Sequence, residues 1–299
     1  MKSANEGQKI QAATGKTYYT ATLLLPERVR NHIFALYGYV RTADNFVDES
    51  NAPGHEQRRA VEEYRRQTIA AIRDPDSTKD KVLKNFANTV QECRIPELEI
   101  HAFLDAMAAD ASKKTYKDMH ELQHYMRGSA TAVGNMMLPI MGFSGEKEEV
   151  KRQARALAEA FQMTNFMRDV NEDYKQRGRI YLPQTTLAKH GVTEADIAKG
   201  KMTPGLTKAM AELSIWTRNQ YHDGVAGIKH LKPDCRYGVL VAAILYLRVH
   251  EKIEKADYNI FKRNPRLTKT EKSLILAKTW MRYKVLKQSE LRCAGLTVH

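Results

Sequence analysis

Two short acidic stripes, about 120 residues apart, constrain most strongly how this chain can fold. Asp44 and Asp48 stand four residues apart in the first stripe, and Asp169 and Asp173 stand four apart in the second. Side chains at i and i+4 project from one face of an α-helix, so each pair predicts a helix with two acids one turn apart. Mostly apolar residues flank both pairs, and carboxylates in apolar surroundings are costly unless a cation or hydrogen bonds compensate them.

The rest of the chain also has a helical character. Strand-like alternation is scarce, whereas apolar residues recur at spacings of three and four almost throughout, so the sequence predicts a mostly α-helical protein. No solenoid repeat and no linker-like change of composition divides the chain, and we predict one domain over residues 1–299. The predicted helices run from Pro26 to about residue 50 and over 55–72, 79–92, 96–111, 118–142, 147–175, 205–230, 234–260 and 268–286.

The net charge and the cysteine content indicate which binding partners and which cellular compartment suit the protein. A formal net charge of +13 suits a nucleic acid, an anionic membrane or an anionic substrate. The basic residues are scattered and no nucleic-acid-binding motif occurs, so we expect no nucleic-acid partner. The longest apolar run, Tyr237–Leu247, predicts a core helix rather than a membrane span. Three cysteines without metal-ligand spacing and an N-terminus without an apolar leader favour a cytoplasmic protein, with peripheral contact to an anionic membrane as an addition.

Further polar residues extend both acidic stripes at helical spacing. Tyr37 and Arg41 precede the first pair, and Gln162 and Asn165 precede the second. An amphipathic surface helix would carry a similar stripe. Here the neighbouring residues are mostly apolar, so the stripes are expected either to line a cavity that binds a ligand or to form a structural polar network in the core. We favour the ligand site.

The residue types in the stripes indicate which ligand such a site would take. Carboxylate pairs with amide oxygens beside them suit Mg²⁺ or Mn²⁺, whereas zinc would favour His or Cys. Arg41 belongs to the first stripe and Arg168 directly precedes Asp169 of the second, and a guanidinium group binds phosphate oxygens through two hydrogen bonds. The combination predicts a site that binds a diphosphate through metal ions and ionises an allylic diphosphate.

A carbocation formed in this way needs aromatic faces and apolar walls around it. Small residues at Gly128, Ala132 and Gly134 would either let helices pack closely or leave room for a long prenyl chain. Four tyrosines in apolar or small-residue contexts are candidates for contact with the cation: Tyr18, Tyr37, Tyr125 and Tyr246.

At these residues the chain resembles the squalene/phytoene synthase family, whose head-to-head prenyltransferases carry two DxxxD motifs. Asn45 stands where many members have a second Asp, and Thr17-Tyr18 stands where Ser-Phe is common. The Asn45 change should be mild, because the first and fifth residues of the motif are the ligands. The resemblance covers about residues 17–280 and is carried by Leu24–Arg41, Asp44–Asp48, Tyr125–Gly142, Gln162–Pro183 and Tyr246–Phe261.

The resemblance implies an all-α, isoprenoid-synthase-type helical bundle around a central cavity that binds Mg²⁺ or Mn²⁺. It implies condensation of two prenyl diphosphates through a cyclopropyl diphosphate intermediate. The metal ligands that carry over are Asp44, Asp48, Asn165, Asp169 and Asp173. The substrate and diphosphate contacts that carry over are Tyr37, Arg41, Tyr125, Gln162, Arg168 and Tyr246, with Tyr18 lining the first pocket.

Three products are open within this family: phytoene from two geranylgeranyl diphosphates, dehydrosqualene from two farnesyl diphosphates, or squalene when NADPH reduces the intermediate. Residues 125–130 and 178–183 look most like prokaryotic phytoene synthases, so we expect phytoene and carotenoid biosynthesis, with NADPH only for squalene. A few side chains that set cavity depth can change the accepted chain length. Terpene cyclisation, head-to-tail elongation and a basic helical protein that binds membranes or nucleic acid are the alternatives.

Overall fold

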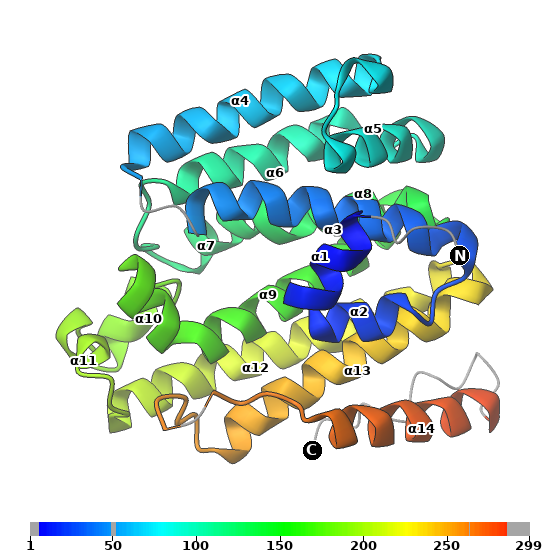
Figure 1. The fold of residues 1–299 in the computed structure, drawn as a ribbon. Helices are drawn as coiled ribbons and strands as arrows, with labels where there is room; N and C mark the ends of the chain where they lie inside the picture. Colours follow the sequence, from blue (N-terminus) through cyan, green and yellow to red (C-terminus); the bar gives the residue numbers. More distant parts are fainter. Residues whose placement is uncertain (1–5, 49–51, 263, 286–299) are drawn as a thin grey trace. The chain divides into compact units, whose positions relative to one another are not determined.

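The chain folds into helices in the part that the structure, a computed structural model, describes (Figure 1). That part covers residues 6–48, 52–262 and 264–285. Apart from isolated bridges such as the one between Thr115 and Ile180, these residues form no β-structure, so the all-α prediction is confirmed. In chain order the α-helices are α1 (Glu6–Thr14), α2 (Lys16–Thr22), α3 (Glu27–Asp48), α4 (Gly54–Arg73), α5 (Lys81–Cys93), α6 (Glu97–Asp110), α7 (Met119–Met126), α8 (Ala132–Met141), α9 (Lys147–Arg177), α10 (Gln184–Lys189), α11 (Glu194–Ala198), α12 (Pro204–Ala226), α13 (Pro233–Lys255) and α14 (Lys269–Val285).

The predicted helices are present, and the differences have local causes. The prediction carried α13 to residue 260, but the chain leaves the helix at Lys255 because Asp257 and Tyr258 adopt left-handed conformations with φ of 51° and 58°. The predicted helix over 118–142 contains a π-helical turn at Arg127–Thr131 between α7 and α8. Helices α1, α2, α10 and α11 were not predicted, because helices of five to nine residues are too short to show a clear apolar period.

Contacts between elements divide the chain into two units, while the single domain over 1–299 stays a prediction. The first unit takes the described residues up to Lys113, together with Arg127–Lys147 and His230–Gly238. In it α1 and α5 pack on α3, and α5 and α6 pack on α4, as Figure 1 shows for the helices in blue and cyan. Tyr39 of α3 is fully buried at the centre, with ring centroids 3.7 Å from Phe86 and 5.2 Å from Tyr64.

A close contact between α6 and the π-helical turn explains why position 128 is a glycine. A Cβ atom built on Gly128 would lie 2.4 Å from the Ala102 carbonyl oxygen and 2.6 Å from the Ala106 Cβ. No side chain fits there, so the structure supports close helix packing at Gly128. Beside it, buried Glu99 accepts hydrogen bonds from Arg127 at 2.8 Å and from Asn135 at 2.9 Å, which ties the turn to α6.

The second unit comprises Lys114–Met126, Glu148–Lys229 and the described residues from Val239 onward. Helix α12 and the part of α13 from Val239 onward lie side by side in Figure 1, and a buried polar contact joins them: Ser214 Oγ lies 2.8 Å from His250 Nε2. Ser214 also donates to Glu254 at 2.6 Å. The predicted core helix around Tyr237–Leu247 is α13, in which Val241 and Leu245 are fully buried.

A second part of the same polar network holds α9 in the unit. Thr164 Oγ1 of α9 lies 2.8 Å from the hydroxyl of Tyr221, and His250, which is fully buried, lies beside Thr164 with 3.4 Å between Nδ1 and Oγ1. Because buried polar groups are costly without partners, this network favours one rotation of α9 about its axis. Thr164 faces the core, and the neighbouring Asn165, which belongs to the second acidic stripe, is half-buried.

Candidate functional site

The first stripe lies along α3 as predicted. Tyr37, Arg41, Asp44 and Asp48 are all half-buried, and the opposite side of the helix is buried core. Arg41 Nη1 donates to Asp44 Oδ2 at 2.6 Å, and the two side chains keep 24% and 34% of their surface exposed. A charged donor thus compensates one of the two acids within one turn of the helix.

The junction of α1 and α2 covers Tyr37. Its hydroxyl lies 3.2 Å from Thr14 Oγ1, and its ring centroid is 6.4 Å from that of Tyr18. A Cβ atom at Gly15 would lie 2.4 Å from the Tyr37 hydroxyl oxygen, so only glycine leaves room for this ring. Burial raises the pKa of Tyr37, which keeps its hydroxyl protonated at neutral pH. The structure therefore brings together two of the tyrosines that the sequence singled out.

The second stripe lies along α9, also as predicted. Gln162, Asn165, Asp169 and Asp173 are half-buried, and the two aspartate side chains expose 19% and 14% of their surface. Arg168 donates from Nε to Asp169 Oδ1 at 2.8 Å and from Nη2 to Oδ2 at 2.5 Å. Arg177 donates to Asp173 at 3.1 Å.

The two predicted phosphate-binding arginines, Arg41 and Arg168, therefore each pair with an aspartate of their own motif. Asn45 lies outside the first stripe and was left out of the predicted ligands. Its Oδ1 is buried and has no hydrogen-bond partner among the residues that the structure describes.

The oxygens of the second stripe fit a hard divalent cation. Asn165 Oδ1 is buried and accepts no hydrogen bond from any described residue, which is an arrangement that needs a partner. Two carboxylates follow on the same helix, and Mg²⁺ and Mn²⁺ prefer oxygen ligands of both kinds. Among the described residues no three His, Cys, Asp or Glu side chains form a group that would hold a metal ion alone. A metal centre that combines both acidic pairs therefore stays a prediction.

Aromatic residues surround Tyr125 in the second unit. Its ring centroid lies 5.7 Å from Tyr181, which stacks on Phe166 of α9 at 4.1 Å, and Tyr116 lies 5.0 Å from Tyr125. All four rings are buried. Sequence reasoning missed Tyr116 and Tyr181 as members of this cluster. Tyr181 lies eight residues after Asp173 of the second acidic motif, which is a usable signal, whereas nothing in the spacing indicates Tyr116.

Tyr246 lies in a separate aromatic contact of the second unit. Its ring stacks on Phe161 of α9, with 4.5 Å between centroids and 23° between planes. Only 6% of Tyr246 is exposed. Phe161 directly precedes Gln162, so this contact also touches the segment of α9 where the second stripe begins.

The loop between α13 and α14 reaches the second acidic motif, which the sequence did not indicate. Asn264 Nδ2 donates to Asp169 Oδ1 at 3.2 Å. Arg266 lies 3.8 Å from Glu172 in the same motif. Asn264 and Asp169 are 95 positions apart in the chain, so no helical spacing could predict the contact.

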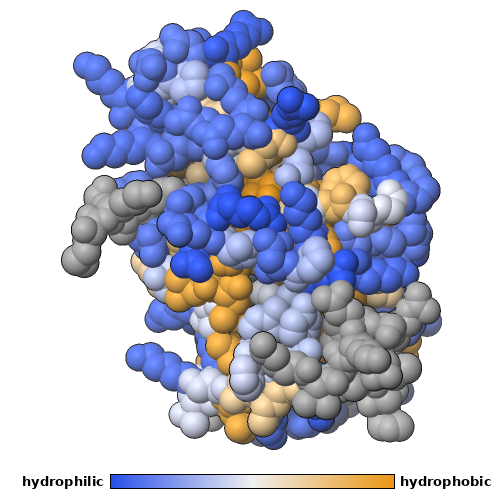
Figure 2. All heavy atoms as spheres, turned by 90° about the vertical axis from the view of Figure 1, so that its right-hand side faces the viewer, coloured by the Kyte–Doolittle hydropathy of each residue, from blue (hydrophilic) through white to orange (hydrophobic). Residues whose placement is uncertain are grey.

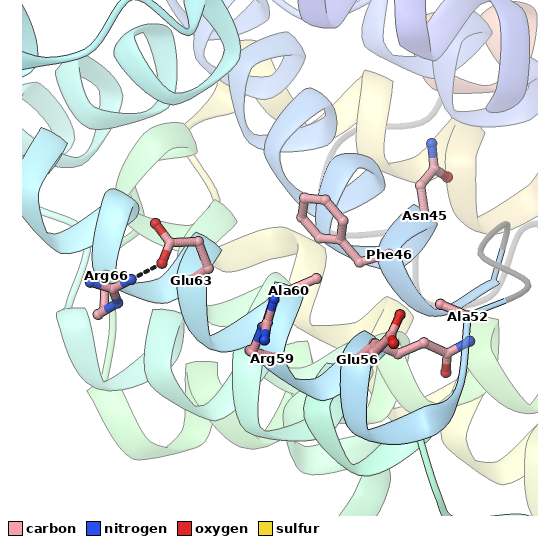
Figure 3. Close-up of a pocket in the computed structure, with 9 residues that line it drawn as sticks. Asn45, Phe46, Ala52, Glu56, Arg59, Ala60, Glu63 and Arg66 are labelled. Carbon is pink, nitrogen blue, oxygen red and sulfur yellow. Dashed lines mark ion pairs between the residues drawn. The ribbon is translucent and has the colours of Figure 1, made fainter.

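A surface pocket of about 930 Å³ opens beside the first stripe but does not include it. Figure 3 shows its walls: Asn45 and Phe46 come from α3, and Glu56, Arg59, Glu63 and Arg66 follow along α4, where an ion pair joins Arg66 to Glu63. None of the predicted site residues lines it. Its charged walls do not suit a prenyl chain, which would need apolar surroundings.

Comparison with known proteins identifies the family. The profile of the family described as squalene/phytoene synthase matches residues 11–271. The chain belongs to the squalene/phytoene synthase family. Members of this family are prenyltransferases, and they use divalent metal ions.

Individual relatives of this family member are phytoene synthases. The chain is 33% identical over 274 residues to phytoene synthase 2, chloroplastic, of Solanum lycopersicum, which covers 90% of this chain and 86% of that protein. It is 34% identical over 267 residues to a chloroplastic phytoene synthase of an Oncidium hybrid cultivar, which covers 86% of this chain. The chain spans about 62% of the length of the Oncidium protein.

Solved structures confirm the predicted isoprenoid-synthase fold of this family member. A dehydrosqualene synthase in complex with a ligand matches with a TM-score of 0.84 at 24% identity, over 94% of this chain and 96% of that chain. Squalene synthase HpnC from Alicyclobacillus acidocaldarius matches with a TM-score of 0.75 at 22% identity, over 85% of this chain and 93% of that chain.

We predict that Gly15→Ala destabilises the protein by about 1–3 kcal/mol, because the added methyl group collides with Tyr37. The backbone itself tolerates alanine, since φ of Gly15 is −108°. In a Tyr37→Ala background the collision is absent, and Gly15→Ala should cost less than about 0.5 kcal/mol. Urea unfolding of the four proteins in the cycle measures this coupling. Equal costs of Gly15→Ala in both backgrounds would show that Gly15 does not hold the ring of Tyr37.

Proposed function

We propose that the protein condenses two geranylgeranyl diphosphates head to head into phytoene, through a cyclopropyl diphosphate, in carotenoid biosynthesis. The observation that carries the proposal is the pair of half-buried DxxxD stripes on α3 and α9, each with an arginine paired to its first aspartate. Phytoene synthases at 33–34% identity support the choice of substrate and product. Squalene or dehydrosqualene formation from farnesyl diphosphate is the alternative, with NADPH required only for squalene.

The stripe residues supply a diphosphate site in this proposal. Asp44, Asp48, Asp169 and Asp173, together with Asn165, would hold Mg²⁺ or Mn²⁺, and the bound ions neutralise the charge of the leaving diphosphate. We propose that the two stripes act as one site on shared ions. Arg41 and Arg168 bind phosphate oxygens beside those ions, as planar donors suited to this geometry.

In this proposal the aromatic residues stabilise the carbocation that forms when the diphosphate leaves. The buried rings around Tyr125 and the stacked pair of Tyr246 and Phe161 offer π-faces and exclude water, which a carbocation requires. Tyr37 stays protonated and donates a hydrogen bond to substrate. Tyr18 and Gln162 contact the prenyl diphosphates.

Incubation with each prenyl diphosphate and Mg²⁺, followed by mass spectrometry of the hydrocarbon, tests the proposal. Geranylgeranyl diphosphate should give phytoene with or without NADPH, at least about tenfold faster than farnesyl diphosphate gives a C30 product. Asp48→Ala and Asp173→Ala should each lower turnover by at least about 100-fold, because charge stabilisation of the leaving group is lost. Glu27→Gln on α3 and Glu148→Gln on α9 are matched controls on the same helices, and both should keep wild-type turnover.

Other results would change this assignment. A C30 product formed preferentially from farnesyl diphosphate would replace phytoene by one of the two alternative products. Full turnover in both aspartate variants, with unchanged far-UV circular dichroism, would remove the stripes from the active site. A cyclic or head-to-tail product would contradict head-to-head condensation altogether.

We also propose a peripheral contact of α14 with anionic membranes. Leu274, Trp280 and Met281 expose 54%, 53% and 53% of their surface, and exposed Lys278 and Arg282 lie on the same helix. Exposed apolar side chains together with basic residues suit the surface of an anionic bilayer, where each well-placed Lys or Arg contributes about 1 kcal/mol.

Surface hydropathy and the helices themselves are also relevant to the cellular location of the protein. Figure 2 shows one face of the molecule, where hydrophilic residues predominate among the coloured atoms and smaller hydrophobic areas lie between them. In the part of the chain that the structure describes, no helix combines the length and hydrophobicity needed to cross a bilayer. We propose the cytoplasm as the location, a reducing compartment that suits thiols such as those of Cys93 and Cys235.

Flotation with vesicles of stated composition tests the membrane contact. The protein should float with phosphatidylglycerol-containing vesicles and much less with pure phosphatidylcholine vesicles. A variant with Leu274→Ser, Trp280→Ser and Met281→Ser should bind at least about tenfold more weakly, because three exposed apolar side chains that would enter the bilayer are lost. Ile215→Ser changes a residue of α12 that is 66% exposed and should leave flotation unchanged. Equal flotation with both vesicle types would contradict the proposal.

A further inference from the structure

The contact between Asn264 and Asp169 joins a distant loop to the second acidic motif within one unit. Asp169 Oδ1 accepts hydrogen bonds from Arg168 Nε at 2.8 Å and from Asn264 Nδ2 at 3.2 Å, while Oδ2 accepts from Arg168 Nη2. Arg168 and Asp169 are adjacent on the same helix. Asn264 is therefore the donor to this carboxylate that comes from outside α9 among the contacts found in the described residues.

The loop that carries Asn264 is anchored to α13 just after Asn264. Lys252 of α13 donates to the Arg266 carbonyl oxygen at 3.1 Å and forms an ion pair with Glu271 of α14 at 2.7 Å. Pro265, directly after Asn264, is buried and has a fixed φ. A side chain held in this way can orient the group to which it donates, because its own position costs little further entropy.

The chemistry of the amide suits an orienting role. A carboxylate has about four acceptor sites, so the bonds from Arg168 and Asn264 leave room for further ligands. The Asn264 amide is neutral, so beside the two bonds from Arg168 it further restrains Oδ1 of Asp169 without adding a second positive charge that would oppose a bound cation. Asn264 Oδ1 is buried and has no hydrogen-bond partner among the described residues, so the orientation of the amide rests on the bond to Asp169.

We propose that Asn264 is a positioning residue that holds the Asp169 carboxylate in the orientation in which it binds the metal ions of the diphosphate site. This inference rests on the proposed function, because it assigns Asp169 to that site. It places one determinant of metal affinity in the loop between α13 and α14, outside both DxxxD motifs.

Binding of Mn²⁺ in the presence of inorganic diphosphate, followed by electron paramagnetic resonance, tests the role without turnover. Asn264→Leu keeps the size of the side chain but removes the donor, and it should weaken Mn²⁺ binding by about 10–100-fold, the usual effect of losing a partner of a metal ligand. The Asn264→Ser side chain also cannot reach Asp169, so this variant should lose as much Mn²⁺ affinity as Asn264→Leu. Asn264→Gln keeps an amide donor and should restore affinity to within about threefold of the wild type.

A matched control lies in the same loop. Asn259→Leu makes the same chemical change at a residue whose side chain accepts a hydrogen bond from the Lys262 amide, and it should leave Mn²⁺ affinity unchanged. Melting temperatures of all variants, measured without metal, show whether each is folded. A purely structural role would move the melting temperature and not separate Asn264→Gln from Asn264→Ser in Mn²⁺ affinity.

The experiment distinguishes failure of the role of Asn264 from failure of the proposed function. Wild-type affinity in Asn264→Leu and Asn264→Ser, together with loss of binding in Asp169→Ala, would overturn the role of Asn264 and leave the proposed function intact. Equal Mn²⁺ binding by the wild type and Asp169→Ala would overturn the proposed metal site, and the inference with it.

Discussion

The electrostatic cost of four half-buried aspartates is the constraint on which the rest of this account depends. Two carboxylates on one turn of a helix repel each other, and removal from water raises that cost. The structure shows part of the compensation, in the hydrogen bonds from Arg41 to Asp44 and from Arg168 to Asp169. In the proposed function the remaining compensation comes from divalent cations and the diphosphate that they bind.

Keeping these acids half-buried requires a helix that cannot rotate, and α9 meets this need through its buried face. Thr164 contacts Tyr221 and His250, and the network continues to Glu254 through Ser214. Burial alone would raise the pKa of Glu254, but hydrogen bonds from His250, Arg218 and Ser214 outweigh it and lower the pKa. Glu254 therefore stays ionised at neutral pH and keeps its donors in place, which fixes the face of α9 that carries Asn165 and Asp169.

The sequence was sufficient for those features that depend on local spacing. The stripes on α3 and α9 and the helices that carry them follow from helical periodicity. For Gly128 the sequence left close packing and room for a prenyl chain open, and only the contact with Ala102 in the structure supports close packing. Contacts that depend on tertiary packing could not be predicted from local spacing. Tyr116 joins Tyr125 and Asn264 reaches Asp169 only because the chain folds back, and no pattern in the sequence encodes either contact.

Our central proposal is that the two acidic stripes act on one diphosphate through shared ions, rather than as two independent metal sites. Titration of Mn²⁺ in the presence of inorganic diphosphate, with the wild type, Asp48→Ala, Asp173→Ala and the double variant, measures this directly. A single shared site predicts that either substitution removes most of the diphosphate-dependent binding and that the second adds little. Loss of about half of the bound Mn²⁺ in each single variant, with additive loss in the double variant, would contradict it.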